Sequence, residues 1–512
     1  MNSIRTLICF LGLLAVVSGC VHKRDQSTAW EIVSHEDWQR SVAESEGVEI
    51  TDGLLSPIGK TGSYRSQLNR FSDLQTLESL TISQSSVWQN WTAVDKVAPS
   101  NLQDAPVFLA LGSQNYWIFG RYGKPEVTGF VGADVELEGF DIPLKTTPFP
   151  KQYDAPGGLK PSMDGYHAWQ SRDMIHWVHH GPVSDRRARW VTTAEYVNGK
   201  TYIYYDFPND QDPHLLIDND LTDGMPGTDM GMVFKDPSDG SDIAIIRDES
   251  GQFHLIYEDW SPVHAGAHSW DSPLAGHAVS ADGMGDFKIL DPVIDERTQP
   301  TGVFKEYAHP HWYRDDPANY QGKPTKKGEF RAFARYEVHE PEQNAYGDWA
   351  SIKIGGQYYL FGDFHPAGTK LRSEMQIAWF TATNIDGPFE PCGSIGSGHP
   401  DPDIGFAEGR FYLINQTNND YVSPGPWVES VEVRVGVDTT NDGQVDVWSG
   451  WQSVRETYDY VEGFAKQISR APASIETSQL PKGYGFCFEL RIEDQTENSS
   501  KPVLDSVRLS FN

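Results

Sequence analysis

Short apolar stretches alternate with glycine-containing turns along most of the chain, and one such pattern recurs five times. Each copy has an apolar segment, a turn with Gly and a return segment carrying Tyr or Phe; the copies are residues 104–120, 190–206, 241–259, 347–363 and 399–416. Apolar runs of this length bounded by turn residues predict strands. Because the copies are spaced by about one four-stranded unit plus loops, they predict a β-propeller with five blades.

The segments on either side of these repeats differ from them in their pattern of apolar and polar residues. Residues 21–95 are polar and are predicted to form a partly helical lead-in segment, whereas residues 425–512 again alternate with strand period. We therefore predict an all-β protein, with a five-bladed β-propeller catalytic domain over 96–424 and a small C-terminal β-sandwich-like accessory domain. An insertion over 293–343 is longer than a blade connection needs, and ordered loops of this length often shape binding sites.

The first 20 residues predict export. A single Arg is followed by an apolar run that is too short to span a membrane and ends in "VSGC", which resembles a bacterial lipobox. This resemblance implies that residues 1–20 form a signal peptide, with Cys20 as the lipidated residue, and Val21 after it favours the outer membrane or cell surface. Of the other cysteines, Cys392 and Cys487 would remain as one bridge or as two free thiols.

Charge narrows the class of partner. The formal net charge of −31 repels nucleic acid and anionic membrane surfaces, so we expect no nucleic-acid partner and membrane contact only through the lipid anchor. Aromatic residues make up 12% of the chain, a composition common in all-β proteins that handle sugars.

Acidic residues recur at the head of the repeats, where the first strand of a blade reaches the mouth of the channel. Asp104 opens the first copy, Asp242 the third and Asp348 the fourth, while His399 and Asp401 open the fifth. A single Asp before a strand is often a turn cap. Three carboxylates at the same repeat position favour a shared site instead.

Converging carboxylates of this kind suit glycoside hydrolysis, in which one acts as a base toward water and another protonates the leaving oxygen. A third can adjust the pKa of the acid. Trp260 and Trp349, which lie near these acids, are candidates for stacking on a sugar ring.

The repeats resemble those of glycoside hydrolase family 43 and its five-bladed relatives, families 62, 32, 68 and 117, over residues 100 to about 420. The matching features are an Asp before the first copy, "NGKTYIYY" in the second, "DIAIIRDESG" in the third, "GGQYYL" in the fourth and "EGRFYL" after Gly398 and His399 in the fifth.

This resemblance implies roles for individual residues. Asp104 would be the general base and Asp242 the residue that adjusts and orients the acid, while His399 would face the channel and help to hold water or a calcium ion. The chain departs from the family at the acid, because Gly347 stands where the family has Glu. Asp348 and Glu342 are therefore both candidates for the acid, and a histidine, His339 or His399, is a further one because family 117 uses histidine.

The leading hypothesis is an exo-acting, inverting glycoside hydrolase that acts on plant or algal carbohydrate and needs no cofactor for its chemistry. The sequence leaves open whether a structural calcium or other ion lies near His399 in the channel. A non-catalytic glycan-binding propeller is the alternative, and splayed acids at the mouth would favour it. A phosphorylase-like relative would need a basic cluster at the mouth, for which only Arg335 and Arg247 are candidates.

Overall fold

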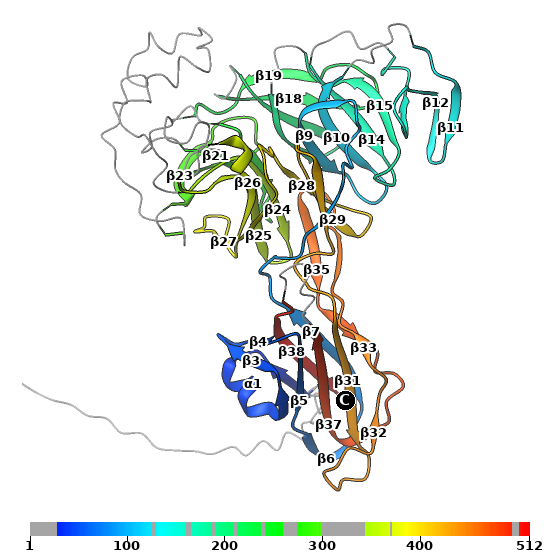
Figure 1. The fold of residues 1–512 in the computed structure, drawn as a ribbon, viewed down its shortest axis with the longest axis vertical. Helices are drawn as coiled ribbons and strands as arrows, with labels where there is room; N and C mark the ends of the chain where they lie inside the picture. Colours follow the sequence, from blue (N-terminus) through cyan, green and yellow to red (C-terminus); the bar gives the residue numbers. More distant parts are fainter. Residues whose placement is uncertain are drawn as a thin grey trace, which may run out of the picture.

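The structure is a computed structural model with two lobes joined by a narrow neck (Figure 1). It describes residues 28–123, 130–159, 165–185, 190–207, 212–236, 241–259, 274–295, 297–298, 344–368, 371–493 and 501–512. Among these residues, no helix is long and apolar enough to cross a membrane.

The upper lobe is a ring of five four-stranded antiparallel units. The first blade contains β9 (Leu102–Ala110), β10 (Tyr116–Tyr122), β14 (Tyr166–Ser171) and β15 (Trp177–Pro182), extended by β11 (Asp134–Leu137), β12 (Phe140–Thr146) and β13 (Gln152–Asp154). The second contains β16 (Trp190–Val197), β17 (Lys200–Asp206), β18 (Pro213–Asp218) and β19 (Thr228–Met232). The third contains β20 (Ala244–Arg247), β21 (Phe253–Glu258), β22 (Ala275–Ser280) and β23 (Lys288–Ile294).

Two more units close the ring. The fourth blade contains β24 (Ala345–Ile354), β25 (Gln357–His365), β26 (Gln376–Ala382) and β27 (Glu390–Ile395). The fifth contains β28 (Asp403–Ala407), β29 (Arg410–Ile414), β30 (Asn419–Ser423) and, as its outermost strand, β8 (Thr92–Asp95) from before the first blade. The inner strands contact one another in the order β9, β16, β20, β24, β28 and back to β9. The predicted all-β fold with a five-bladed propeller is thus confirmed by the strand pairing itself.

The lower lobe is a β-sandwich built from both ends of the chain. One sheet contains β3 (Val48–Thr51), β4 (Leu54–Pro57), β38 (Leu504–Phe511), β7 (Leu77–Gln84) and β36 (Ala473–Ile475), with β1 (Thr28–Ile32) paired to β38. The other contains β2 (Val42–Glu46), β5 (Thr61–Ser66), β37 (Gly483–Glu493), β31 (Val431–Asp438) and β32 (Val447–Trp448), with β6 (Asn69–Gln75) and β33 (Gln452–Ser453) at its edges.

Strand-period alternation gives this lobe its core. In β31 the valines at 431, 433, 435 and 437 are buried, and alternate residues of the neighbouring strand β37 lie beside them in the same core. The short helix of this lobe, α1 (His35–Ser41), begins after Ser34, whose hydroxyl accepts a hydrogen bond from the Asp37 amide as an N-cap.

The expected lead-in segment is corrected by this pairing. Residues 28–84 form seven strands of the sandwich, not a separate segment before the propeller, and Thr28 pairs with Phe511 at the far end of the chain. The accessory lobe therefore comprises N-terminal and C-terminal residues together. The remaining cysteines, Cys392 and Cys487, are free thiols.

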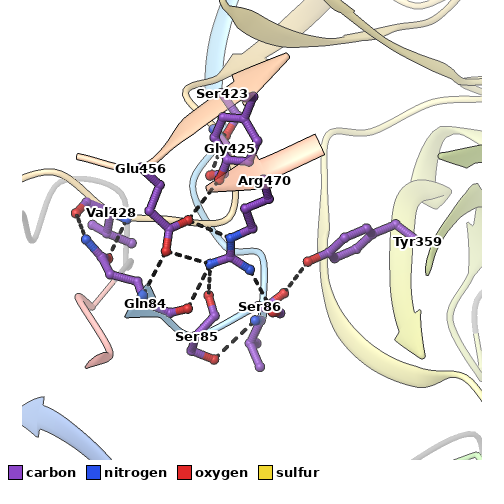
Figure 2. Close-up of polar contacts among 11 residues, drawn as sticks. Gln84, Ser85, Ser86, Tyr359, Ser423, Gly425, Val428, Glu456 and Arg470 are labelled. Carbon is purple, nitrogen blue, oxygen red and sulfur yellow. Dashed lines mark hydrogen bonds and ion pairs between the residues drawn. The ribbon is translucent and has the colours of Figure 1, made fainter. Parts of the chain in front are cut away.

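A buried polar cluster fixes the neck between the lobes (Figure 2). The Arg470 guanidinium donates to Glu456 through Nε at 2.6 Å and Nη2 at 3.0 Å, and to the carbonyl oxygen of Gln84 at 2.7 Å. Glu456 also accepts from the Gln84 amide, and Tyr359 of the fourth blade donates to the carbonyl oxygen of Ser86. The sandwich is thereby tied directly to a blade.

A hairpin from the lower lobe closes one end of the propeller channel. It contains β34 (Thr457–Tyr460) and β35 (Gln467–Ala471), and β35 pairs in parallel with the end of β24. Lys466, 3% exposed, donates to the Thr193 hydroxyl of β16 at 2.7 Å. This end of the channel is occupied, so the candidate site lies at the opposite end.

Candidate active site at the channel mouth

Four aspartates at the mouth share an unusual backbone conformation. Asp104, Asp242, Asp348 and Asp401 have φ values of 71°, 46°, 49° and 42°, and each lies at or just before the inner strand of its blade. Positive φ is uncommon for residues with a side chain, although Asp tolerates it better than most. Repetition of this conformation in four blades indicates a shared structural device that aims the aspartates alike.

In three blades this conformation is held by an acid of the preceding blade. The Asp242 amide donates to Asp206 at 2.9 Å and the Asp348 amide donates to Glu258 at 3.0 Å. The Asp401 amide donates to Asp363 at 2.8 Å.

We call these amide–carboxylate pairs the acid brackets. The three accepting acids are at most 1% exposed and lie at or near the end of the second strand of their blade. The brackets fix the backbone of the mouth aspartates and bring additional negative charge beneath them.

The first blade breaks this pattern with a cation. Arg121 in β10 pairs with Gln103, the residue before Asp104, as Asp363 in β25 pairs with Gly347, the residue before Asp348. An arginine thus stands where the fourth blade has a bracket acid. Its Nε atom lies 2.8 Å from the Asp104 carboxylate.

Aromatic residues surround this ion pair. The Arg121 guanidinium lies 4.7 Å from the centre of the Trp190 ring, a cation–π arrangement. The Tyr166 hydroxyl lies 3.5 Å from the same Asp104 carboxylate. Burial, together with the charge of Asp104, raises the pKa of Tyr166 well above its ordinary value, so its hydroxyl keeps its proton.

The side chains of the mouth aspartates converge. Oxygen atoms of Asp242, Glu258 and Asp348 lie within 4.8 Å of one another, and so do ligand atoms of Asp348, Asp363, His399 and Asp401. Asp348 belongs to both groups and links the third blade to the fifth.

His399 lies among the carboxylates of the second group. Its Nε2 atom is 3.2 Å from Asp401, 3.4 Å from Asp363 and 4.0 Å from Asp348. The Gln416 side chain donates a hydrogen bond of 2.5 Å to Oδ2 of Asp401, whereas His399 lies next to Oδ1. Carboxylate oxygens of this number suit a calcium ion, and the residues fit the calcium expected near His399, which stays a prediction.

The surroundings of Asp401 favour the protonated form of its carboxyl. Burial raises its pKa well above the ordinary value, and the negative charge of Asp363 raises it further, with smaller contributions from Asp242 and Asp104. Its hydrogen bond with Asp348 acts in the opposite direction. The carboxyl of Asp401 therefore differs from an ordinary exposed aspartate in its greater affinity for a proton.

A pocket opens among these residues. Its wall contains Ala105, Pro106, Val107, Trp190, Val191, Thr192, Asp242, Ile243, Asp348, Trp349, His399, Asp401 and Pro402. All five inner strands or their leading residues contribute to it, so it lies at the axis of the propeller.

The structure brings together five of the residues predicted from the sequence. Asp242, Asp348, His399 and Asp401 line the pocket, and Asp104 borders it next to Ala105. Glu342, Trp260, His339 and Arg335 lie outside the described residues, as does the lipidation candidate Cys20, so those roles stay predictions.

Trp349 does not fit its predicted stacking role. Its side chain is buried, with 2% exposure, and packs against Tyr346 and Phe380 in the core between the third and fourth blades. Trp349 contributes to the pocket wall, but a side chain with 2% exposure leaves no open ring face on which a sugar could stack.

Sequence reasoning missed Trp190 as a site residue, together with Arg121 and the three bracket acids. A signal for the brackets was present, because the second, third and fourth repeats end in "YYD", "YED" and "FGD". The first repeat continues as "FGRY", which marks Arg121 as the exception.

Comparison with known proteins identifies similar solved structures. No protein-family model and no curated protein sequence matches the chain. Among solved structures, a GH43_1 enzyme from Xanthomonas citri is 13% identical, with a TM-score of 0.36, over 69% of this chain and 93% of that one. An endo-arabinase from Bacteroides thetaiotaomicron is 12% identical, with a TM-score of 0.36, over 65% of this chain and 97% of that one.

An arabinanase from Bacillus subtilis is 13% identical, with a TM-score of 0.32, over 64% of this chain and 95% of that one. TM-scores of this size add nothing to the fold, which rests on the strand pairing described above.

Proposed function

We propose that this protein is a glycoside hydrolase whose mouth carboxylates cleave a glycosidic bond with inversion at the anomeric carbon. The observation that carries the proposal is that Asp348 lies close to Asp242 on one side and to Asp401 on the other. In each case the carboxylate oxygens lie within 4.8 Å of one another, and all three residues line one pocket. Splayed acids would have favoured glycan binding alone.

In this mechanism Asp104 is the general base. Its carboxylate accepts a proton from a water molecule, whose oxygen bonds to the anomeric carbon while the bond from that carbon to the leaving oxygen breaks. The Arg121 ion pair, at 2.8 Å, holds the Asp104 carboxylate in one orientation for this step.

Asp348 is the general acid and Asp401 is its partner. The leaving oxygen receives the proton of Asp348, which Asp348 shares with the hydrogen-bonded Asp401. Two carboxyls this close titrate as a pair, so one proton is retained between them. Asp242 contributes negative charge to the same pair and orients it.

Trp190 and Thr192 form the wall of the pocket where no mouth aspartate stands. Aromatic faces bind the apolar faces of sugar rings, and a hydroxyl can hydrogen-bond a sugar hydroxyl. We assign substrate positioning to this wall. The substrates we propose are plant or algal oligosaccharides, cleaved from an end of the chain.

We also propose that the mature protein is anchored to the membrane by a lipid on Cys20. The first described strand, β1, begins at Thr28 and pairs with β38 of the sandwich. An anchor at Cys20 therefore places the sandwich nearest the membrane. Replacing Cys20 by Ser should move the protein from the membrane fraction to the soluble fraction; an unchanged distribution would contradict the anchor.

A panel of plant and algal oligosaccharides tests the proposed activity. The purified protein is incubated with each, and the anomeric configuration of the first product is followed by proton NMR. We expect hydrolysis with inverted product. Binding without turnover of any member would favour the glycan-binding alternative, and product of retained configuration would exclude the roles given above.

A further inference from the structure

A second cluster of histidines and carboxylates lies on the third blade, away from the mouth. The His254 ring on β21 and the His277 ring on β22 share a hydrogen bond of 2.9 Å between Nδ1 and Nε2. At the other side of His254, Nε2 lies 3.4 Å from the Asp248 carboxylate. At the other side of His277, Nδ1 lies 3.9 Å from the carboxylate of Asp386, on the turn after β26 of the fourth blade.

These four side chains form a row with three gaps between them. Each neutral imidazole carries one N–H, so the two rings supply two hydrogens for three gaps. Whichever tautomers the rings adopt, at least one of the three gaps lacks a hydrogen, so that two lone pairs face each other across it. Two acceptors that face each other repel unless a cation or a water molecule lies between them.

The distances locate the gap that lacks a hydrogen. The Nδ1 atom of His277 is buried and has no hydrogen-bond partner among the described residues, whereas the other two gaps are bridged. His277 is 0% exposed. A third hydrogen would place a positive charge on this buried ring, which is costly.

The first blade provides an internal comparison. There the carboxylate of Asp154 lies 2.9 Å from His179, which in turn lies 2.9 Å from His167. These two contacts need two hydrogens, which two neutral rings supply. In the third blade the row continues from His277 to Asp386, at the longer separation of 3.9 Å.

We infer that His277 Nδ1 and the Asp386 carboxylate bind a divalent transition-metal ion, such as Zn²⁺, that joins the third blade to the fourth. Ligand atoms of His254, His277 and Asp386 all lie within 4.8 Å of one another. Ligands of a tetrahedral zinc ion lie about 3.4 Å apart, given bonds of about 2.0–2.1 Å, so the 3.9 Å separation needs only a small rotation of Asp386.

The surroundings match those of metal-binding histidines. Such a histidine usually donates its other N–H to a second residue that fixes its ring. With Nδ1 of His277 bound to the metal, His277 would donate through Nε2 to His254, and His254 would donate to Asp248. The Asp386 side chain is 59% exposed, so water can complete the coordination.

The site is separate from the mouth. His254 and the bracket acid Glu258 lie four residues apart on β21, about 13 Å at the rise of a strand. We therefore assign the ion a structural role as a clasp between blades.

Zinc titration of the metal-free full-length protein tests the inference. We expect Asp386→Asn to weaken one equivalent of zinc binding at least tenfold by calorimetry, and to leave the metal-free melting temperature unchanged because Asp386 is exposed. Zinc should raise the melting temperature of the wild type and not that of this variant. The matched control is Asp173→Asn, which removes the partner of His176 at 2.7 Å on another blade and should bind zinc as the wild type does.

Zinc bound by the acids of the mouth would still bind to Asp386→Asn, so this variant distinguishes binding at the mouth from binding at His277 and Asp386. Cobalt offers a second readout, since an imidazole ligand changes its visible absorption, and His277→Gln should abolish that change where it folds. Equal zinc affinity and equal stabilisation in wild type and Asp386→Asn would overturn the inference, as would absence of zinc binding to the wild type.

Discussion

The two sides of the channel mouth are built differently. On the side of the third, fourth and fifth blades, an aspartate at positive φ is held by an acid bracket from the blade before it. On the side of the first and second blades the bracket acid is replaced by Arg121 and the mouth carries Trp190 and Thr192. The repeated side concentrates carboxylates, and the exceptional side offers a cation and an aromatic surface.

This difference suggests a division of labour. A ring of five equal blades would place the same group at every position, and no residue would be distinguished as acid, as base or as sugar-binding surface. Departures from the repeat therefore carry as much information about function as the repeat itself. In the proposed mechanism the repeated side supplies the acid, and the exceptional side positions both the base and the sugar.

The largest effect should follow removal of the acid. We expect Asp348→Asn to lower kcat/KM by about 10²–10⁴-fold, the range typical of general acid–base residues. The loss should be much smaller on an aryl glycoside whose leaving group needs no protonation. An equal loss on both kinds of substrate would argue against the acid role of Asp348, for which Glu342 would then be the candidate.

The second effect concerns the cation of the exceptional side. Arg121→Met removes a charge-assisted contact to Asp104, worth about 1.5–3 kcal/mol, so kcat/KM should fall by about tenfold to a hundredfold. Arg121→Lys keeps the charge without the planar guanidinium, so its kcat/KM should lie between those of the wild type and Arg121→Met. Activity of Arg121→Met equal to that of the wild type would remove Arg121 from the mechanism.

A smaller effect is expected at the aromatic wall. Trp190→Ala removes a stacking surface worth about 0.5–1.5 kcal/mol, so KM should rise about three- to tenfold with a lesser change in kcat. Trp190→Phe keeps a ring over Arg121 and serves as the control for loss of that contact. If Trp190→Ala lowers kcat alone, its role is to support Arg121 and not to bind sugar.

The smallest effect is on stability and concerns the repeated side. Because the folded state raises the pKa of Asp401, the folded protein holds this proton more tightly than the unfolded chain does. Stability from this group is therefore greatest below the unfolded pKa and is lost as pH rises through the folded pKa. Asp401→Asn cannot ionise, so its melting temperature should fall less between pH 5 and pH 8 than that of the wild type, by about 2 °C or more. An identical pH dependence would contradict a protonated Asp401.

The sequence allowed the propeller and part of the site to be predicted, because both repeat locally. Each blade begins with a strand, a turn and a strand that are contiguous in the chain, and the mouth aspartates recur at one place in that unit. The C-terminal half of the sandwich was predicted, but its N-terminal half was missed because the strands pair across the whole chain, as Thr28 pairs with Phe511. A local signal existed even there, since Leu80, Ile82 and Gln84 are buried in alternation along β7.

Individual side chains were harder to predict than positions. Trp349 follows Asp348 in the chain, yet the bulge in β24 sends its ring to the core. Trp190 and Arg121 come from different blades, and their stacking depends on how those blades meet. Such contacts follow from three-dimensional packing and have no counterpart in the spacing of one repeat.

The central claim is that the mouth aspartates are catalytic, and Asp104→Asn tests it most directly. Its turnover should be compared with that of the wild type on a substrate found in the oligosaccharide panel, at equal folded concentration. Asp52→Asn is the matched control, because Asp52 in the sandwich also has positive φ, at 50°, and lies far from the mouth in sequence. We predict a loss of about 10²–10⁴-fold in kcat for Asp104→Asn and none for Asp52→Asn; wild-type turnover by Asp104→Asn would contradict the account.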